Sequence, residues 1–351
     1  MRKNGKPKII FCIGDANIGG AEKQLVRLAQ EIHKTNTFEV IIWFLNSGGP
    51  LIKQVEESEI KYKIFELHIL KPWKLLNLIF EFRTTNPEII NTYLVKNIFI
   101  ISIIKPFLNS QAKFIGSIRG INFKKSFLYK VIFWTALKSC NKIICNSNFL
   151  KSFLGSNYEK KTIVIKNGVD LEESERFLVS SKNIVMISNF HPYKGFDLLI
   201  EILNKIRSEC DITIYGDVTE FIKLFDPKQI KNNIKIGFKN QVEKLNNSDL
   251  TNYRFAIHTS RSEGLSNAII EELSAGLPVI AFNVGGNSEL IIDGTNGFLI
   301  PAFDVAKFAE KIDELLKNST LVTNLSKNSK NTIMELSWGN IVNNHLSLYM
   351  H

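Results

Sequence analysis

The sequence predicts an α/β protein made of two doubly wound, Rossmann-like domains. Strand-like apolar runs alternate with helical patterns along the chain, as they do in parallel sheets covered by helices. The alternation occurs in two separate series with a polar stretch between them. The chain has 351 residues, which is too long for one ordinary hydrophobic core and fits two domains of ordinary size.

The first series of elements begins close to the start of the chain. Residues 8–13 form a short apolar run, and a loop with Gly19 and Gly20 then leads to an amphipathic helix from Ala21. Four further apolar runs predict strands at 38–45, 88–93, 113–118 and 142–145. Helical or turn material follows each strand, which is the pattern of a doubly wound domain.

The second series follows a polar stretch at 171–182 that lacks a strong period. Six apolar runs predict strands at 184–187, 211–215, 234–236, 255–258, 278–281 and 297–300. We therefore expect an N-terminal domain at 1–172 and a C-terminal domain at 173–336.

The stretch 260–289 carries the most chemistry, because it places two carboxylates around a helix start. The helix is expected to begin near Ser266, with Glu263 in the loop before it and Glu271 on its second turn. The amides of Gly264, Leu265 and Ser266 would favour an anion such as a diphosphate. Carboxylates can bridge adjacent sugar hydroxyls, so the pattern predicts a nucleotide-sugar site. The alternative is that the two glutamates only complement the helix dipole.

The surrounding motifs resemble a known family. The pair Glu263 and Glu271 is followed by AGLPVIA at 275–281 and then by Gly285, Gly286 and Glu289. This order resembles the donor-binding signature of the retaining glycosyltransferases of the GT4 family, also called glycosyltransferase group 1. Further segments of the chain resemble that family too, at 19–29, 144–154, 165–170, 187–201 and 214–217. The similarity therefore extends over nearly the whole chain.

The resemblance implies a GT-B fold, in which the two domains face each other across a cleft and a C-terminal helix at about 337–351 packs back on the first domain. It also implies an enzyme that moves a hexose-type residue from a nucleoside diphosphate-sugar to an acceptor hydroxyl, with retention at the anomeric carbon. The expected acceptor is a surface polysaccharide or a lipid-linked glycan. The expected enzyme needs neither a metal nor a cofactor, and the sequence contains no Asp-x-Asp.

The resemblance also assigns roles to individual residues. Lys194 and the amides at 264–266 would neutralise the departing diphosphate, which makes Lys194 and Glu263 the expected catalytic residues. Glu271 would accept hydrogen bonds from the ribose, and Glu263 from the donor sugar. The remaining expected donor-binding residues are Gly19, Gly20, Asn189, Gly237 and Phe238.

Two positions depart from the family pattern. Asn189 stands where many members have an Arg, which leaves one phosphate charge for Arg261 or Arg119 to compensate. Arg119 stands where several members have a His. A guanidinium there could contact phosphate or acceptor, but it could not act as a general base. The alternative for Arg119 is a structural bond to a local carbonyl group.

The positive charge lies in the first half of the chain. Residues 1–175 carry 26 Lys and Arg against 15 Asp and Glu, and 89–158 carry ten Lys and Arg with no acid. The segment 123–138 adds Phe127, Val131 and Trp134 at helical spacing. Such a helix could lie on an anionic membrane surface. The alternative is that these three side chains face the core while the lysines are solvated.

Other observations limit the location and the competing functions. The apolar run near the N-terminus is too short for a signal peptide, so we expect a cytoplasmic protein, with the inner face of the plasma membrane as a peripheral location. A catalytically impaired GT-B binding or scaffold subunit is a second hypothesis, raised by Asn189. A nucleic-acid-binding protein is a third hypothesis, suggested by the pI of about 9.2 and the basic first half of the chain. It is the weakest, because the basic segment coincides with the expected acceptor-side domain at 1–172 and no nucleic-acid motif is present.

Overall fold

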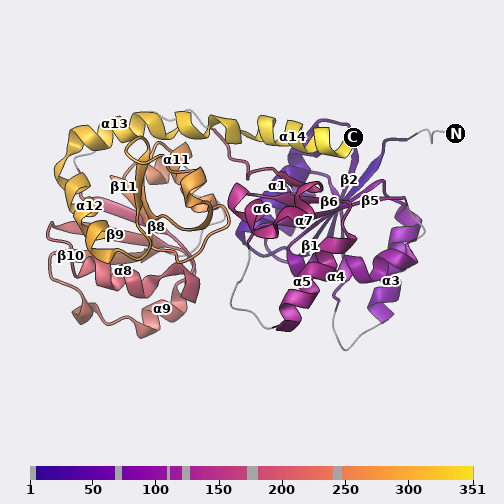
Figure 1. Ribbon diagram of the computed structural model, residues 1–351, viewed down its shortest axis with the longest axis horizontal. Coiled ribbons are helices and arrows are strands. Elements are labelled where there is room, and N and C mark those ends of the chain that lie inside the picture. The colour runs from indigo at the N-terminus through magenta and orange to yellow at the C-terminus, as the bar shows by residue number, and fades with distance from the viewer. Residues whose placement is uncertain are drawn as a thin grey trace. The chain divides into compact units, whose positions relative to one another are not determined.

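A computed structural model describes residues 5–67, 73–108, 111–120, 127–171, 181–239 and 247–350. The chain forms two compact units (Figure 1). Unit 1 contains residues 1–168 and 338–351, and unit 2 contains residues 169–337. Each unit is a Rossmann-like α/β domain with one parallel sheet, so the predicted fold class is confirmed.

The sheet of unit 1 has the strand order β3-β2-β1-β4-β5-β6-β7. Its strands are β1 (Lys8–Asp15), β2 (Glu39–Ser47), β3 (Lys61–Ile64), β4 (Ile89–Tyr93), β5 (Lys113–Ile118), β6 (Lys142–Cys145) and β7 (Thr162–Val164). Five of these were predicted, because a parallel sheet buried on both faces needs apolar runs. β3 and β7 were missed. They are the two edge strands, β3 is largely exposed, and β7 has only three residues.

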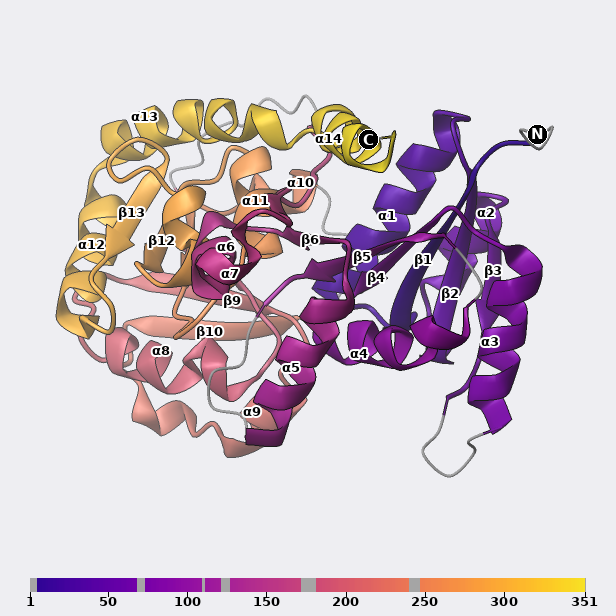
Figure 2. The same ribbon diagram turned by 45° about the vertical axis from the view of Figure 1, so that its right-hand side comes forward.

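Helices cover both faces of this sheet (Figure 2). One face packs against α1 (Gly20–Lys34), α2 (Ile52–Glu57) and α14 (Trp338–Met350). The other packs against α3 (Trp73–Thr85), α4 (Val95–Ile104), α5 (Phe127–Ser139) and α6 (Asn148–Leu154). The 3-10 helix η1 (Lys105–Phe107) follows α4, and α7 (Ser156–Glu159) follows α6. The side chains of β1 alternate between the two cores, as the pleat of a strand requires.

The sheet of unit 2 has the order β10-β9-β8-β11-β12-β13. Its strands are β8 (Asn183–Ile187), β9 (Cys210–Tyr215), β10 (Ile234–Lys239), β11 (Phe255–His258), β12 (Val279–Phe282) and β13 (Gly297–Ile300). All six were predicted, although β10 runs three residues further than expected. The helices are α8 (Phe196–Leu203), α9 (Thr219–Leu224), α10 (Asn247–Leu250), α11 (Asn267–Ser274), α12 (Val305–Lys317) and α13 (Ser319–Ser329). Four 3-10 helices join them: η2 (Pro192–Lys194), η3 (Pro227–Gln229), η4 (Gly285–Glu289) and η5 (Asn331–Leu336).

The last helix, α14, packs on unit 1 although it follows unit 2 in the chain. Its first residue, Trp338, lies against Gly168, where an added Cβ would overlap the indole ring. Near its end, Asn91 Nδ2 donates a hydrogen bond of 2.5 Å to the Tyr349 hydroxyl, and Lys113 Nζ donates one of 2.6 Å to the Leu348 carbonyl. Burial lowers the pKa of His345 to about 3, which keeps this core imidazole neutral.

Three side chains of α5 that were considered as candidates for the core face solvent instead. Phe127, Val131 and Trp134 are 82%, 45% and 37% exposed, while Phe133 and Leu137 fill the core. The interpretation that the first three side chains face the core is therefore wrong. The neighbouring Lys124 and Lys125 lie outside the described residues.

Two further observations concern the helices and the cysteines. In the part of the chain that the structure describes, no helix combines the length and apolar character needed to cross a bilayer. The four cysteines are all buried and reduced. Burial raises the pKa of each thiol to about 12, so none is primed as a nucleophile.

Candidate active site

The candidate site of unit 2 lies at the point where its strand order reverses. From β8 the chain adds β9 and β10 on one side, and it then crosses to add β11 and the later strands on the other side. Ligands of open α/β sheets bind outside the carboxyl ends of the strands at such a reversal. The segment with Lys194 follows β8, and the segment with Glu263 follows β11. The sheet topology therefore brings together two residues that are far apart in the sequence.

Lys194 and Glu263 form an ion pair in this position. Lys194 Nζ lies 2.6 Å from Glu263 Oε1, and the side chains are only 19% and 10% exposed. Burial acts to lower the pKa of Lys194, but the charge of Glu263 and the nearby Tyr193 outweigh it and hold that pKa above its ordinary value. Lys194 is therefore a fixed cation, and its charge is partly balanced by Glu263.

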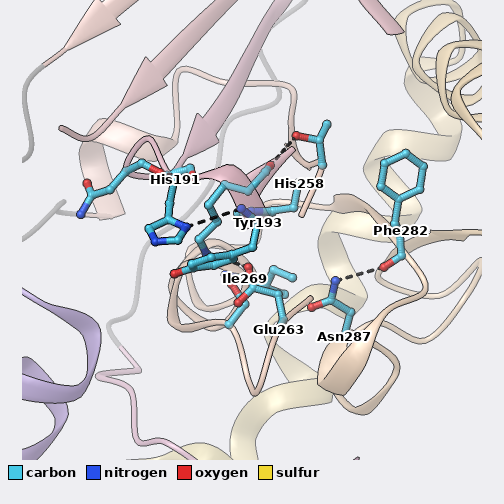
Figure 3. Close-up of polar contacts among 12 residues, drawn as sticks. His191, Tyr193, His258, Glu263, Ile269, Phe282 and Asn287 are labelled. Carbon is cyan, nitrogen blue, oxygen red and sulfur yellow. Dashed lines mark hydrogen bonds and ion pairs between the residues drawn. The ribbon is translucent and has the colours of Figure 1, made fainter. Parts of the chain in front are cut away.

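Backbone contacts hold the two segments against each other. The Arg261 amide donates a hydrogen bond of 2.7 Å to the Tyr193 carbonyl, and Thr259 Oγ1 donates one of 3.0 Å to the Lys194 carbonyl. Gly195 has a φ of 67°, and a Cβ there would overlap the Thr259 carbonyl. Only glycine fits such a left-handed residue in so close an approach. Figure 3 shows the rings of His191 and Tyr193 side by side near Glu263.

Helix α11 begins where the sequence predicted. Ser266 is its N-cap and accepts a hydrogen bond of 3.4 Å from the Ile269 amide. Within the described residues, the amides of Gly264, Leu265 and Ser266 donate no backbone hydrogen bond, so they are available to an anion. Glu271 lies half-buried on the second turn. Glu263, the three amides and Glu271 thus lie in one loop and one helix start, and diphosphate binding there stays a prediction.

Gly285, which follows β12, lies directly against the backbone of Glu263. It has a φ of 57°, and a Cβ there would overlap the Glu263 carbonyl. The Gly286 amide also donates to that carbonyl at 3.4 Å. Asn287 anchors η4 in turn, because its Nδ2 donates a hydrogen bond of 3.0 Å to the Phe282 carbonyl (Figure 3). The two glycines that follow β12 therefore fix the position of Glu263.

We expect Gly285→Ala to weaken binding of a nucleotide-sugar by tenfold or more, because the Glu263 segment must move to admit the methyl group. About 1.4 kcal/mol corresponds to that factor. Calorimetric titration measures the affinity. Gly294→Ala is the matched control, since Gly294 has a φ of 73° but no atom near the added Cβ. Equal affinities in the two variants would contradict the role of Gly285.

A buried acid of α11 contacts a buried imidazole at the end of β11, and this pair was not predicted from the sequence. His258 Nε2 lies 2.7 Å from Glu272 Oε2, and both side chains are almost completely buried. Burial raises the pKa of Glu272, although His258 acts against that shift. The pair joins the end of β11 to α11 and so fixes the helix that carries Glu271. An acid next to Glu271 was the available signal, but its inward orientation depends on the tertiary structure.

The remaining candidates of unit 2 have structural partners. Asn189 Oδ1 accepts a hydrogen bond of 2.9 Å from the Asp217 amide and so ties the carboxyl ends of β8 and β9 together. Arg261 forms a bidentate pair with Asp197, with both distances at 2.6 Å. The sequence analysis did not predict this role for Asp197. Its carboxylate binds the Arg261 guanidinium, which was expected to contact a phosphate in place of the Arg missing at position 189.

Gly237 and Phe238 lie inside β10 rather than after it. The Phe238 ring packs on Phe221 and Phe225, with centroids 6.1 and 5.9 Å apart. Gly237 has open space where a Cβ would lie. Donor binding by these two residues stays a prediction.

The candidates of unit 1 follow β1 and β5. Gly19 is the N-cap residue of α1, and a side chain at this position would displace the flexible carboxylate end of Glu22. Gly20 is the first residue of that helix. Arg119 lies over the Tyr93 ring at 4.2 Å from the centroid, donates to the Tyr93 hydroxyl, and donates a hydrogen bond of 2.7 Å to Asn167 Oδ1. The Arg119 guanidinium is therefore fixed by side chains, and its buried Nε has no partner among the described residues.

Family models match both halves of the chain. Residues 170–332 match the model described as glycosyl transferases group 1, and residues 18–173 match the one described as Glycosyltransferase Family 4. Together the two matches cover residues 18–332.

Curated relatives are glycosyltransferases as well. An uncharacterized glycosyltransferase of Methanocaldococcus jannaschii is 31% identical over 61% of this chain and 61% of its own. A poly(ribitol-phosphate) alpha-N-acetylglucosaminyltransferase of Staphylococcus aureus is 28% identical over 53% of this chain and 38% of its own. The chain thus matches less than two thirds of the length of these two relatives.

Solved structures share the fold. Anabaena HepE, in complex with UDP-glucose, has a TM-score of 0.81 at 18% identity and covers 97% of this chain and 100% of its own. TarM of S. aureus has a TM-score of 0.81 at 15% identity and covers all of both chains. At such identities the likeness establishes the fold alone.

Proposed function

The chain belongs to the group 1 glycosyltransferases of GT-B fold, and from this premise we propose that it transfers a sugar from a nucleoside diphosphate-sugar to an acceptor hydroxyl with retention, as in the GT4 family. The observation that carries the proposal is the Lys194–Glu263 pair beside the unpaired amides of 264–266. A cation and helix amides at a strand-order reversal suit a diphosphate.

In the proposed reaction, the bond between the anomeric carbon and the diphosphate oxygen breaks. The diphosphate leaves with the bonding electrons, the acceptor oxygen bonds to the anomeric carbon, and the proton of the acceptor hydroxyl passes to the departing diphosphate. Lys194 and the amides of 264–266 stabilise the negative charge on the leaving group, so the proposed reaction requires no metal and no cofactor. An assay with and without EDTA tests the metal requirement directly.

We propose a UDP-sugar as the donor and a glycan or lipid-linked acceptor of a surface polymer. HepE and TarM, which share the fold, have been crystallised with UDP or UDP-glucose. The S. aureus relative is named for transfer to poly(ribitol-phosphate). These names support the donor and acceptor classes of the proposal.

A thermal-shift panel of UDP-, GDP- and ADP-sugars tests the donor. A ligand at 100 times its Kd stabilises a protein by about 2.7 kcal/mol, which is readily measured. Release of free sugar or transfer to an acceptor, followed by NMR of the anomeric configuration, tests the reaction. Absence of stabilisation by every donor would overturn the proposal.

We expect Glu271→Ala to weaken donor binding by about 1–3 kcal/mol without unfolding the protein, because hydroxyl groups of the ribose lose a charged acceptor. Isothermal calorimetry with the nucleoside diphosphate measures the loss. Glu310→Ala, on the exposed side of α12, is the matched control. Unchanged nucleotide affinity in Glu271→Ala would reject the assignment.

A binding subunit without transfer activity is a second candidate. It is favoured by Asn189, whose amide oxygen is used by the Asp217 backbone and which supplies no positive charge. Such a protein would bind the donor in the thermal-shift panel and yet release no nucleoside diphosphate. The two candidates are therefore separated by turnover, not by binding.

A further inference from the structure

One helical layer of unit 1 exposes an unusual amount of apolar surface. Large apolar side chains are exposed on α3 and α5 in particular: Trp73, Leu76, Phe80, Phe127, Leu128, Val131 and Trp134. We call these seven residues the α3–α5 face. On the opposite layer, the described residues of α1, α2 and α14 include a single exposed large apolar side chain, Met350. Both helical layers cover the same sheet, but only the layer with α3 and α5 exposes many large apolar side chains.

The apolar residues lie toward the same ends of their helices. In Figures 1 and 2, α3 and α5 flank α4, and their first turns point the same way. A helix that follows a parallel strand runs back against it, so these first turns lie at the carboxyl edge of the sheet. Phe127, Leu128 and Val131 occupy the first two turns of α5, and Trp73 and Leu76 occupy the first turn of α3.

The helices that carry this face are firmly seated, so the exposure is not that of a frayed segment. Phe133 and Leu137 of α5, and Leu78 and Phe82 of α3, are buried in the core. Trp134 stacks on Tyr158 with ring centroids 5.3 Å apart and meets the Phe133 ring edge-on at 5.0 Å, and it is still 37% exposed. The apolar side chains are therefore presented to solvent by a rigid support.

The charge on the α5 side of the face is positive. Lys130 and Lys138 are exposed on α5, and Lys151 follows on α6. The sequence 89–158, which contains all of α4, α5 and α6, has ten Lys and Arg and no acid. On α3, the acidic Glu81 is paired with Lys63. Exposed aromatic and aliphatic side chains therefore lie among cations that no nearby acid of α4, α5 or α6 neutralises.

We propose that the α3–α5 face docks on an anionic lipid surface. Aromatic and aliphatic side chains insert at the headgroup level, and lysines beside them attract anionic lipids. A second copy of the chain is a poorer partner, because two such faces would bring like charges together. This inference goes beyond the proposed function, since it concerns a surface of unit 1 and can be tested without a donor.

The test is sedimentation of the full chain with vesicles of phosphatidylcholine alone or mixed with phosphatidylglycerol. We expect binding to the mixed vesicles only, and we expect it to fade as salt is raised. Each lysine near an anionic surface contributes about 1 kcal/mol, or about a fivefold change in affinity. The double variant Lys130→Gln/Lys138→Gln should therefore bind about 25-fold more weakly. Phe127→Ser/Val131→Ser should lose most of its binding.

Matched controls lie on unit 2. Lys307→Gln/Lys327→Gln removes two exposed lysines, and Ile222→Ser/Leu224→Ser removes two exposed apolar side chains of α9. Both controls should bind vesicles as the wild type does. Equal binding of wild type to neutral and anionic vesicles would overturn the proposal. The proposal would also be overturned if the wild type were a dimer and the Phe127→Ser/Val131→Ser variant a monomer, because the α3–α5 face would then join two copies of the chain.

Vesicle binding and donor turnover are separate measurements, so the two proposals fail separately. A protein that binds anionic vesicles but is stabilised by no nucleotide-sugar would contradict the proposed function alone. A protein that turns over a donor in solution but ignores vesicles would contradict the docking face alone.

Discussion

Lys194→Ala is expected to lower kcat by about 10²–10³-fold at saturating donor, which is the loss typical of removing one preorganised group that stabilises developing charge. The ammonium group is largely buried and fixed by Glu263 at 2.6 Å, so no solvent cation replaces it easily. Affinity for the free nucleoside should change much less, because the charge matters most when the diphosphate leaves. Steady-state kinetics and nucleoside titration measure the two effects.

A second variant separates catalysis from misfolding. Removal of Lys194 alone leaves Glu263 as a mostly buried charge without its partner, which is itself destabilising. The double variant Lys194→Ala/Glu263→Gln removes that charge and should recover thermal stability but not turnover. Lys194→Arg should recover part of the rate, because the guanidinium keeps the charge but has another shape. A wild-type kcat in Lys194→Ala would exclude the proposed role.

Trp338→Ala should reduce the free energy of unfolding of unit 1 by about 3–5 kcal/mol, as for other large aromatic side chains removed from a core. The indole is 9% exposed and packs directly on Gly168. Gly168 has no side chain, so the space left by the indole can be filled from that side only if the backbone shifts. Chemical denaturation followed by far-UV circular dichroism measures the change.

The matched control is Trp73→Ala, which removes the same side chain from a site that is 60% exposed. Surface substitutions usually change stability by less than about 0.5 kcal/mol. A loss of less than about 0.5 kcal/mol in Trp338→Ala, as in the control, would mean that this residue of α14 contributes little to unit 1.

The fold could be predicted because its signals are local. Strands buried on both faces read as apolar runs, and β1, β2, β8, β11 and β12 are of this kind. The direction of α5 could not be predicted in this way. Its sequence is apolar on nearly every side, so Phe127, Val131 and Trp134 have the same helical spacing as a core stripe and yet face solvent. Which side is buried depends on the packing of α4 and the sheet.

The candidate site was only partly accessible from the sequence. The start of α11 at Ser266 follows from local capping chemistry, and the place of Lys194 after β8 follows from the strand pattern. The ion pair of Lys194 with Glu263, and that of Arg261 with Asp197, join residues 69 and 64 positions apart. Contacts across such distances are set by strand order, which a single sequence does not contain.

The return of α14 to unit 1 affects how the chain is made on the ribosome. Residues 169–337 are synthesised between the rest of unit 1 and the helix that completes it. At about 5–20 residues per second, this interval lasts roughly 10–30 s. During that time the surface that later receives Trp338, Ile341 and Tyr349 is uncovered in the nascent chain. Unit 1 can thus complete its fold only after unit 2 has been synthesised, although most of unit 1 emerges first.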